Sequence, residues 1–389
     1  MSATNRIYLD NAATSFPKPE AVYAAVDSWQ RNSGAAAGRG AYSAAIESTS
    51  LVRRCRVRVA ELLGCANPDS VIFTFNGTDS LNLALHGALR PGDHVVTSVV
   101  EHNSVLRPLR DLQISRGVES TQVAVDSRGK VDPAGIREAI RPSTRLVAIT
   151  HASNVSGAIQ PIADIAEVTH ARGILLLVDA AQTAGSVPIN LSSLPIDFLA
   201  CPGHKGLLGP LGTGILCIRE GIAEQLQSVR QGGTGTQSED DRQPESLPDK
   251  FESGNHNVPG LVGLEAAVSW IRERWVEVIA AEEAELTARL WNGLSGLSGV
   301  RLFGPPPGPG RVGVVSLVIE GYDPQDAAAI LDETFGVQVR SGLHCAPGAH
   351  RVLGTFEGGG TVRLSVGAFT TADGVDQAIH AVGTIAGSA

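Results

Sequence analysis

The chain has 389 residues, of which 43% are hydrophobic and 18% charged, and its formal net charge is −9 at pH 7. This length exceeds the size at which one hydrophobic core keeps growing, so we expect two domains, and the composition excludes disorder as the main state. The negative charge argues against nucleic acid or an anionic membrane as a partner, because phosphate binding draws on an excess of Lys and Arg.

The cysteines and the N-terminus predict a compartment. The five cysteines are odd in number and scattered, without a Cys-x-x-Cys pair, so neither a disulfide framework nor a metal site is indicated. Residues 1–10 lack the apolar run of a signal peptide, and no segment approaches the roughly twenty apolar residues of a membrane span. We therefore expect a cytoplasmic protein that neither enters a membrane nor is exported.

Short β-branched runs alternate with helical patterns through the first two thirds of the chain. The sequence predicts helices at 80–89, 104–117, 133–140 and 163–172, and strands at 71–75, 94–99, 145–150, 174–178, 198–200 and 214–218. Strands buried by helices on both faces imply a mostly parallel sheet that binds ligands at its carboxyl ends. The polar stretch 232–248 is either a mobile loop or an active-site cover, and we favour a plain loop.

The last third of the chain predicts a second, smaller unit. A long helical pattern from Val258 to about Leu297 forms a bridge, and the Pro- and Gly-rich run 304–310 is a turn. Strands are predicted at 314–319, 337–340 and 362–365, with helices at 324–334 and from residue 371. We predict a large α/β domain over 16–260 and a small α+β domain over 261–389, with residues 1–15 packing near the small domain.

Lys205 and Asp179 are the residues most informative about function. A lysine amine can form a Schiff base with pyridoxal phosphate, and a carboxylate at a strand's end can keep the pyridine nitrogen protonated, which makes the ring an electron sink. Asp179 ends an apolar strand, and Lys205 lies in the Gly- and Pro-rich run 201–210. From these two residues alone, a surface lysine and a helix-capping aspartate remain an alternative.

Two further segments could bind parts of such a cofactor. The run from Asn76 to Asp79 follows a strand and opens a helix, so backbone amides and the Thr78 hydroxyl can hold a phosphate. A simple helix cap by Thr78 is the alternative. His102 lies just past another strand, where an aromatic side chain can stack on a cofactor ring, although a lone histidine can equally be structural.

Arg363 and Cys345 are candidates for binding and reacting with a substrate. Arg363, inside a short strand, is costly to bury unless its guanidinium meets an anion, either an amino acid carboxylate or an intramolecular partner. Cys345 lies between two glycines and beside His344 and Arg340, so its thiol can be mobile, exposed and partly ionised. The alternative for this cysteine is a small core residue.

Over nearly its whole length the chain resembles the class V pyridoxal-phosphate enzymes, and within them the cysteine desulfurase and selenocysteine lyase branch. The matching stretches keep the order that this family shows: 8–14, 76–79, 101–104, 153–157, 178–182, 203–205, 340–346 and 361–365. The resemblance implies the aspartate-aminotransferase-like fold, fold type I, with a mostly parallel mixed sheet in the large domain and pyridoxal 5'-phosphate as the cofactor.

The resemblance also implies roles for single residues. Lys205 would hold the cofactor, Asp179 its pyridine nitrogen, Gln182 its phenolic oxygen, and His102 would stack on its ring. The phosphate would be bound by Gly77, Thr78 and His204, although Pro202 replaces a serine that is frequent in the family and cannot donate a hydrogen bond. Asn255 stands where a threonine usually reaches the neighbouring subunit's phosphate, which implies a homodimer with shared active sites.

On the substrate side, the resemblance makes Arg363 the carboxylate anchor, with Asn154 contacting the carboxylate or the phenolic oxygen and Arg39 near the site. Cys345 would take sulfur from L-cysteine as a persulfide, release alanine, and pass the sulfur to an acceptor, which can be a protein. Other reactions on a related amino acid stay open: a selenocysteine lyase, a C–S lyase or an aminotransferase. A cofactor-binding protein without catalysis is a further alternative, because Pro202 and Asn255 depart from the family pattern.

Overall fold

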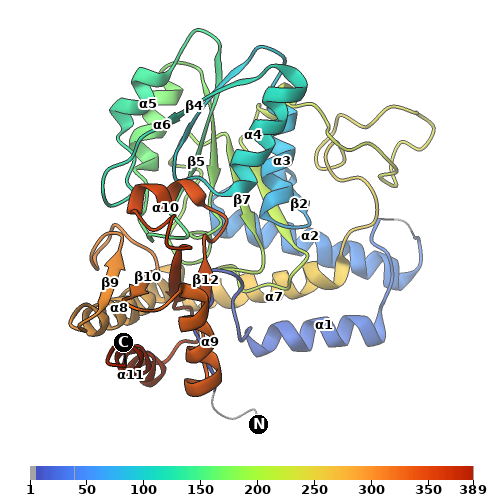
Figure 1. Cartoon of the computed structure of the whole chain (residues 1–389). Coiled ribbons are helices and arrows are strands. Elements are labelled where there is room, and N and C mark those ends of the chain that lie inside the picture. The colour runs from blue at the N-terminus through green and yellow to red at the C-terminus, as the bar shows by residue number, and fades with distance from the viewer. Residues whose placement is uncertain (1–5, 39, 389) are drawn as a thin grey trace.

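The computed structural model describes residues 6–38 and 40–388, and its centre is a seven-stranded sheet (Figure 1). The strand order is β2-β8-β7-β6-β5-β3-β4, and only β8 runs in the direction opposite to the other strands of this sheet. The predicted mostly parallel mixed sheet is therefore confirmed. Its strands are β2 (Val71–Thr74), β3 (His94–Ser98), β4 (Glu119–Val123), β5 (Thr144–Thr150), β6 (Leu175–Asp179), β7 (Phe198–Pro202) and β8 (Gly214–Ile218).

Helices cover both faces of this sheet, as the apolar runs of its strands require. In β5, Val147 and Ile149 point into one core, whereas Leu146 and Ala148 point into the other, because successive side chains of a strand alternate. The second core includes residues of α3 (Gly77–Ala88) and α4 (Asn103–Arg116). The first includes residues of α1 (Glu20–Asn32), α2 (Ser43–Leu63), α5 (Pro133–Ala139), α6 (Ile162–His170) and α7 (Val258–Arg274).

The long helix predicted over 258–297 is broken in the structure. Trp275, with φ at +69°, separates α7 from α8 (Val276–Ser295), so the prediction of one continuous helix was wrong at this residue. Helix α7 packs on α1 and α2, whereas α8 packs on α11 (Ala372–Ala386) and β9 (Val300–Phe303). The packing partners thus change at Trp275, and the domain division at residue 260 stays a prediction.

A four-stranded antiparallel sheet carries the C-terminal part, in the order β12-β13-β10-β9. Here β1 (Ile7–Tyr8) pairs in parallel with β11 (Val337–Gln338), and Leu9 joins the core beneath the sheet, which brings the N-terminal segment beside β13. The remaining elements are η1 (Pro68–Ser70), η2 (Ala223–Gln225), β10 (Val314–Ile319), α9 (Pro324–Phe335), β12 (Arg340–Gly342), α10 (Pro347–Leu353) and β13 (Thr361–Ser365).

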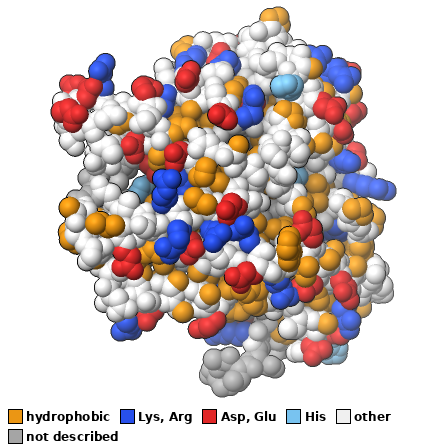
Figure 2. Space-filling model, turned by 180° about the vertical axis from the view of Figure 1, so that it is seen from behind, with side chains coloured by type: hydrophobic (Ala, Val, Ile, Leu, Met, Phe, Trp, Pro, Cys, Tyr) orange, Lys and Arg blue, Asp and Glu red, His pale blue; other side chains and the backbone are white. Residues whose placement is uncertain are grey.

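Charged side chains of both signs are interspersed on the face shown in Figure 2. Several partly exposed arginines are already in ion pairs, for example Arg272 with Glu61 and Arg274 with Glu282. Such pairs neutralise cationic charge locally, and each contributes little to stability in high dielectric. Within the described residues, no helix has the length and apolar character needed to span a membrane.

Candidate active site

The carboxyl ends of the parallel strands form one cavity that collects most of the predicted site residues. Asp179 ends β6, Thr150 beside it ends β5, and Lys205 follows the end of β7. Gly77 and Thr78 begin α3 and His102 caps α4, so the cavity also meets two helix N-termini. The predicted residues that line it are Gly77, Thr78, His102, Asn154, Asp179, Gln182, His204 and Lys205.

Lys205 and Asp179 form the electrostatic centre of this cavity. Burial lowers the pKa of the Lys205 amine to about 8, although the Asp179 carboxylate opposes that shift. Asp179 is 4% exposed, and its burial raises the pKa of its carboxyl group. The Ala181 N–H donates a hydrogen bond of 2.9 Å to this carboxylate, which lowers the pKa but does not cancel the rise. The alternative of a surface lysine is wrong, because its amine interacts with a buried carboxylate.

The start of α3 offers donors to an anion. Asn76 is the helix cap, because its side-chain oxygen accepts from the Asp79 N–H over 2.9 Å, so the alternative of a cap by Thr78 was wrong. The Gly77 and Thr78 amides are the first of the helix and have no acceptor within it. A Cβ on Gly77 would come within 3.1 Å of Pro202 Cδ, so a side chain there would crowd the proline.

His102 is held as a neutral ring at the edge of the cavity. Its Nδ1 accepts the Ser104 N–H over 3.0 Å and lies 2.8 Å from the Ser104 hydroxyl. Burial, helped by the positive charge of Lys205, lowers the pKa of His102 to about 4. The pKa of His204 is likewise lowered to about 4, mainly by burial, and its Nδ1 is a buried atom without a partner in the described chain.

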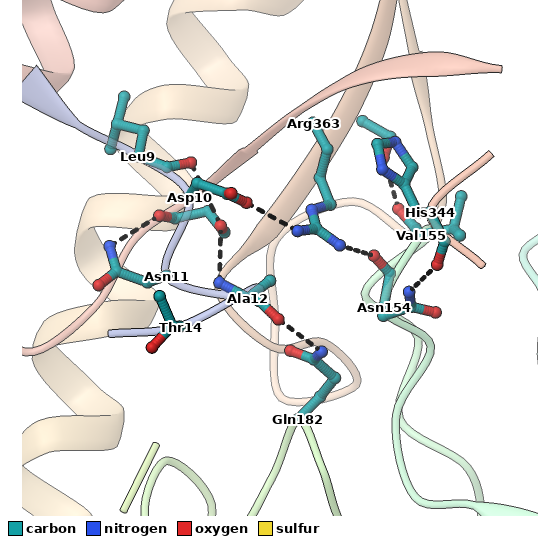
Figure 3. Close-up of polar contacts among 12 residues, drawn as sticks. Leu9, Asp10, Asn11, Ala12, Thr14, Asn154, Val155, Gln182, His344 and Arg363 are labelled. Carbon is teal, nitrogen blue, oxygen red and sulfur yellow. Dashed lines mark hydrogen bonds and ion pairs between the residues drawn. The ribbon is translucent and has the colours of Figure 1, made fainter. Parts of the chain in front are cut away.

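Arg363 lies at the junction of the two sheets, where the segments around residues 10, 154 and 344 meet (Figure 3). It is 1% exposed; Nη2 donates to the Asp10 carboxylate over 2.8 Å, and Nη1 to the Asn154 carbonyl over 3.2 Å. The interpretation as an intramolecular ion pair is therefore confirmed. Its Nε is buried without an acceptor in the described residues, and the substrate-anchor role stays a prediction.

The loop that carries Cys345 is fastened to the edge of the cavity. The Asn103 N–H donates to the Cys345 carbonyl over 2.7 Å, and the Asn154 amide donates to the His344 carbonyl over 2.7 Å. The Cys345 side chain is exposed, so the alternative of a small core residue is wrong. Both His344 and Cys345 have positive φ, at +48° and +59°, a conformation that costs energy in residues other than glycine.

His344 does not assist the thiol as the sequence suggested. Its ring is 5% exposed, and Nε2 lies 3.1 Å from the Thr361 hydroxyl in the protein interior. Burial lowers the pKa of His344 to about 2, so the imidazole is neutral and supplies no positive charge to Cys345. The physical reason is that the His344 ring turns inward to Thr361 of β13, whereas the next side chain, Cys345, is exposed.

A sequence profile described as aminotransferase class-V matches residues 7–378. The chain belongs to the class V aminotransferase family. A probable cysteine desulfurase from Methanothermobacter thermautotrophicus is 37% identical, over 98% of this chain and 95% of its relative. A cysteine desulfurase from Haloferax volcanii is 31% identical, over 97% of this chain and 89% of its relative.

Two solved structures of cysteine desulfurases share this fold. The apo structure of a cysteine desulfurase from Thermococcus onnurineus NA1 superposes with a TM-score of 0.92 at 32% identity, covering 99% of this chain and 95% of that one. A cysteine desulfurase from Escherichia coli in an S-sulfonic acid form gives 0.86 at 28% identity, covering 97% and 94%. The predicted family and fold type I are therefore confirmed.

Asn255 lies away from the cavity, and Arg39 is not among the residues that the structure describes. Asn255 is exposed and lines a separate hollow with Phe75, Arg230 and His256, so this class V chain alone does not bring it to Lys205. Gln182 lines the cavity, but its amide donates to the Ala12 carbonyl over 3.1 Å (Figure 3).

Sequence reasoning gave no role to Asp10 or Ser104, which the structure places in the site. Asp10 is separated from Arg363 by most of the chain, and its position in the 8–14 stretch was the only signal. Ser104 lies two residues after His102 in the 101–104 stretch and contacts both His102 and Thr78. A serine at the second helical position could have suggested a bond to the capping side chain.

The residues of the cavity fit pyridoxal phosphate. The buried, unpartnered His204 Nδ1 and the first amides of α3 are suitable for a phosphate, and Asp179 and Lys205, which interact electrostatically, line the same cavity. Over residues 6–38 and 40–388, no group of three or more His, Cys, Asp or Glu side chains could hold a metal ion. The α3 amides and His204 suit the anionic part of an organic cofactor.

Proposed function

We propose that this class V chain is a cysteine desulfurase that converts L-cysteine to L-alanine and keeps the sulfur on Cys345 as a persulfide. One observation carries the proposal: an exposed cysteine sits on a loop tied through backbone carbonyls to Asn103 and Asn154, at the edge of the cavity that contains Lys205. The curated relatives that bear the name cysteine desulfurase over nearly their whole length support it.

Pyridoxal phosphate is the proposed cofactor, held by Lys205, by Asp179 at the pyridine nitrogen and by Gly77, Thr78 and His204 at the phosphate. When bound, it supplies an electron sink for the carbon atoms of the substrate. His102 is neutral, so its ring can stack without bringing a second positive charge to the cofactor.

The reaction needs proton transfer and a sulfur acceptor from the chain itself. The Lys205 amine, with its pKa near 8, is suited to take and return a proton close to neutral pH. Arg363 orients the substrate carboxylate through donors that Asp10 and the Asn154 carbonyl leave free. The Cys345 thiolate attacks the substrate sulfur, an S–S bond forms as the C–S bond breaks, and the carbon gains a proton to become alanine.

The proposal extends to assembly and compartment. Asn255 is exposed, which suits a residue that reaches the phosphate site of a second subunit in a homodimer. All five cysteines are free thiols in the structure, which suits a reducing cytoplasm. A protein thiol that accepts the persulfide sulfur from the exposed Cys345 is the proposed further partner.

Mass spectrometry after incubation with L-cysteine tests the reaction. We expect an adduct of about 32 Da, one sulfur atom, on the peptide that contains Cys345. Cys345→Ala should bind cofactor and lose nearly all alanine production, whereas the control Cys65→Ala, which removes a part-buried thiol elsewhere, should retain both. Normal alanine production by Cys345→Ala would indicate a lyase, and bound cofactor without turnover of any amino acid would refute catalysis.

A further inference from the structure

Ser104 connects two residues of the cavity that the proposed function uses separately. Its hydroxyl oxygen lies 2.7 Å from the Thr78 hydroxyl and 2.8 Å from His102 Nδ1. Ser104 is 8% exposed, so water does not readily replace these bonds. One small side chain therefore joins the helix start proposed for phosphate to the histidine proposed to stack on the ring.

The backbone of Ser104 decides where the proton of the neutral His102 ring resides. The Ser104 N–H donates to Nδ1 over 3.0 Å, so Nδ1 carries the lone pair and the ring proton is on Nε2. Nδ1 therefore cannot donate to the Ser104 hydroxyl. The single hydroxyl proton of Ser104 is available either to His102 Nδ1 or to the Thr78 oxygen.

These two choices depend on what Thr78 does with its own proton. Without an anion, Thr78 can donate to Ser104, and Ser104 then donates to His102 Nδ1. With a phosphate oxygen to accept from it, Thr78 turns its proton to the anion and accepts from Ser104 instead. His102 Nδ1 then keeps only the backbone N–H as a donor.

We propose that Ser104 is a positioning residue that couples phosphate binding at Thr78 to the hydrogen bonding of the His102 ring. The coupling rests on the proposed function, because it takes the start of α3 as the phosphate site. Its chemical content is a reversal of two hydroxyl donors with no net proton transfer. Phosphate binding thereby sets whether His102 Nδ1 accepts one hydrogen bond or two, and this changes the orientation and basicity of the ring.

Nitrogen NMR of the cofactor-free, full-length chain labelled with ¹⁵N-histidine tests the coupling, with inorganic phosphate as the probe. We expect phosphate to shift the His102 Nδ1 resonance in the unsubstituted chain and in Ser104→Thr, which keeps the hydroxyl. In Ser104→Ala the shift should fall to about a third or less, because the hydroxyl donor is absent throughout. The assignment comes from the loss of the His102 resonance in His102→Gln.

Ser80→Ala is the matched control. The Ser80 hydroxyl also lies 2.7 Å from a threonine hydroxyl, that of Thr74, and is buried on the same helix as Thr78, but Ser80 does not line the cavity. Its substitution should leave the phosphate-induced shift unchanged. If Ser104→Ala does not fold, Ser104→Cys gives the same test, because a thiol is a poor donor.

The outcomes separate the coupling from the phosphate site itself. An equal shift in Ser104→Ala and in the unsubstituted chain would overturn the coupling and leave the phosphate site standing. No shift in either would overturn both. As a second readout, Ser104→Ala should raise the Kd of pyridoxal phosphate about threefold to tenfold, whereas Ser80→Ala should not; an unchanged Kd counts against the coupling.

Discussion

A buried ion pair between Arg56 of α2 and Glu252 fixes the segment that follows the polar loop and carries Asn255. The two side chains form a fork, with Nη1 to Oε1 at 2.7 Å and Nη2 to Oε2 at 2.8 Å, and they are 5% and 6% exposed. The same Oε1 accepts the Phe73 N–H of β2 over 2.6 Å. Glu252 therefore holds a helix, a strand and the Asn255 segment together.

Glu252→Ala should lower the free energy of unfolding by about 3–5 kcal/mol, because it leaves the buried Arg56 guanidinium without a carboxylate, with the Val71 carbonyl as its remaining acceptor, and removes the acceptor of the Phe73 N–H. Urea unfolding of the full-length chain measures this change. The double variant Arg56→Met with Glu252→Leu should be more stable than Glu252→Ala alone, because no uncompensated charge stays buried.

An exposed arginine–carboxylate pair with two contacts is the control. Arg289 and Asp376 form a fork with two contacts of 2.6 Å, but their side chains are 50% and 48% exposed. Asp376→Ala should leave the unfolding midpoint nearly unchanged, because solvent screens the pair. Equal losses from Asp376→Ala and Glu252→Ala, or a loss below about 1 kcal/mol from Glu252→Ala, would show that burial does not set the strength of the pair.

Further predictions concern charge within the site. The pKa of Lys205 is lowered to about 8, so about half of its amines are neutral at that pH, whereas ordinary lysines have a pKa near 10.4. In the cofactor-free chain, the rate of reductive methylation of Lys205 should therefore rise as the pH passes about 8. Labelling of Lys205 that rises only above about pH 10 would contradict the lowered pKa. Burial raises the pKa of Glu101 to about 8, so the folded chain binds this proton more tightly than the unfolded chain, and the associated stability is lost as pH rises from about 4.3 to 8. The amide of Glu101→Gln can keep bonds to Ser98 and the Thr150 N–H and carries no charge at any pH. The free energy of unfolding of Glu101→Gln, minus that of the unsubstituted chain, should therefore be larger at pH 9 than at pH 5 in urea unfolding. A difference that is the same at both pH values would refute the raised pKa of Glu101. Arg363→Lys should raise the KM for cysteine about tenfold or more with a smaller change in kcat, because an ammonium lacks the planar fork; an unchanged KM in alanine-formation assays would remove Arg363 from the substrate site.

Local patterns predicted what depends on neighbouring residues in the chain. The apolar runs at 145–150 and 174–178 become central strands, and the run at 71–75 becomes an edge strand; because parallel strands end at one edge, Asp179 and Lys205 were expected together. The break at Trp275 was not predictable, because the helical periodicity continues on both sides of it. The Asp10–Arg363 pair joins residues 353 positions apart, and no local pattern encodes such a contact.

The inward turn of His344 has the same origin. Sequence adjacency placed His344 beside Cys345, but which of two successive side chains enters the core depends on β13, whose Thr361 supplies the partner for the ring. Positive φ at both residues turns the backbone carbonyls toward Asn103 and Asn154, and that choice requires the completed cavity edge. Tertiary contacts, and not local propensity, therefore decide the orientation of the loop that carries Cys345.

An acidic chain can bind an anionic cofactor and an amino acid carboxylate only through local charge. Burial, reinforced by the charge of Lys205, lowers the pKa values of His102 and His204 to about 4, so both rings stay neutral at physiological pH. Burial also lowers the pKa of Arg363, but the Asp10 carboxylate opposes that shift and keeps the guanidinium charged. The positive charge around the cavity thus comes from lysines and arginines, among them Lys205 and Lys18, whose Nζ donates to the His204 carbonyl over 3.0 Å, while both histidines are neutral. A protonated His102 would add a further positive charge beside Lys205, and burial prevents that protonation at physiological pH.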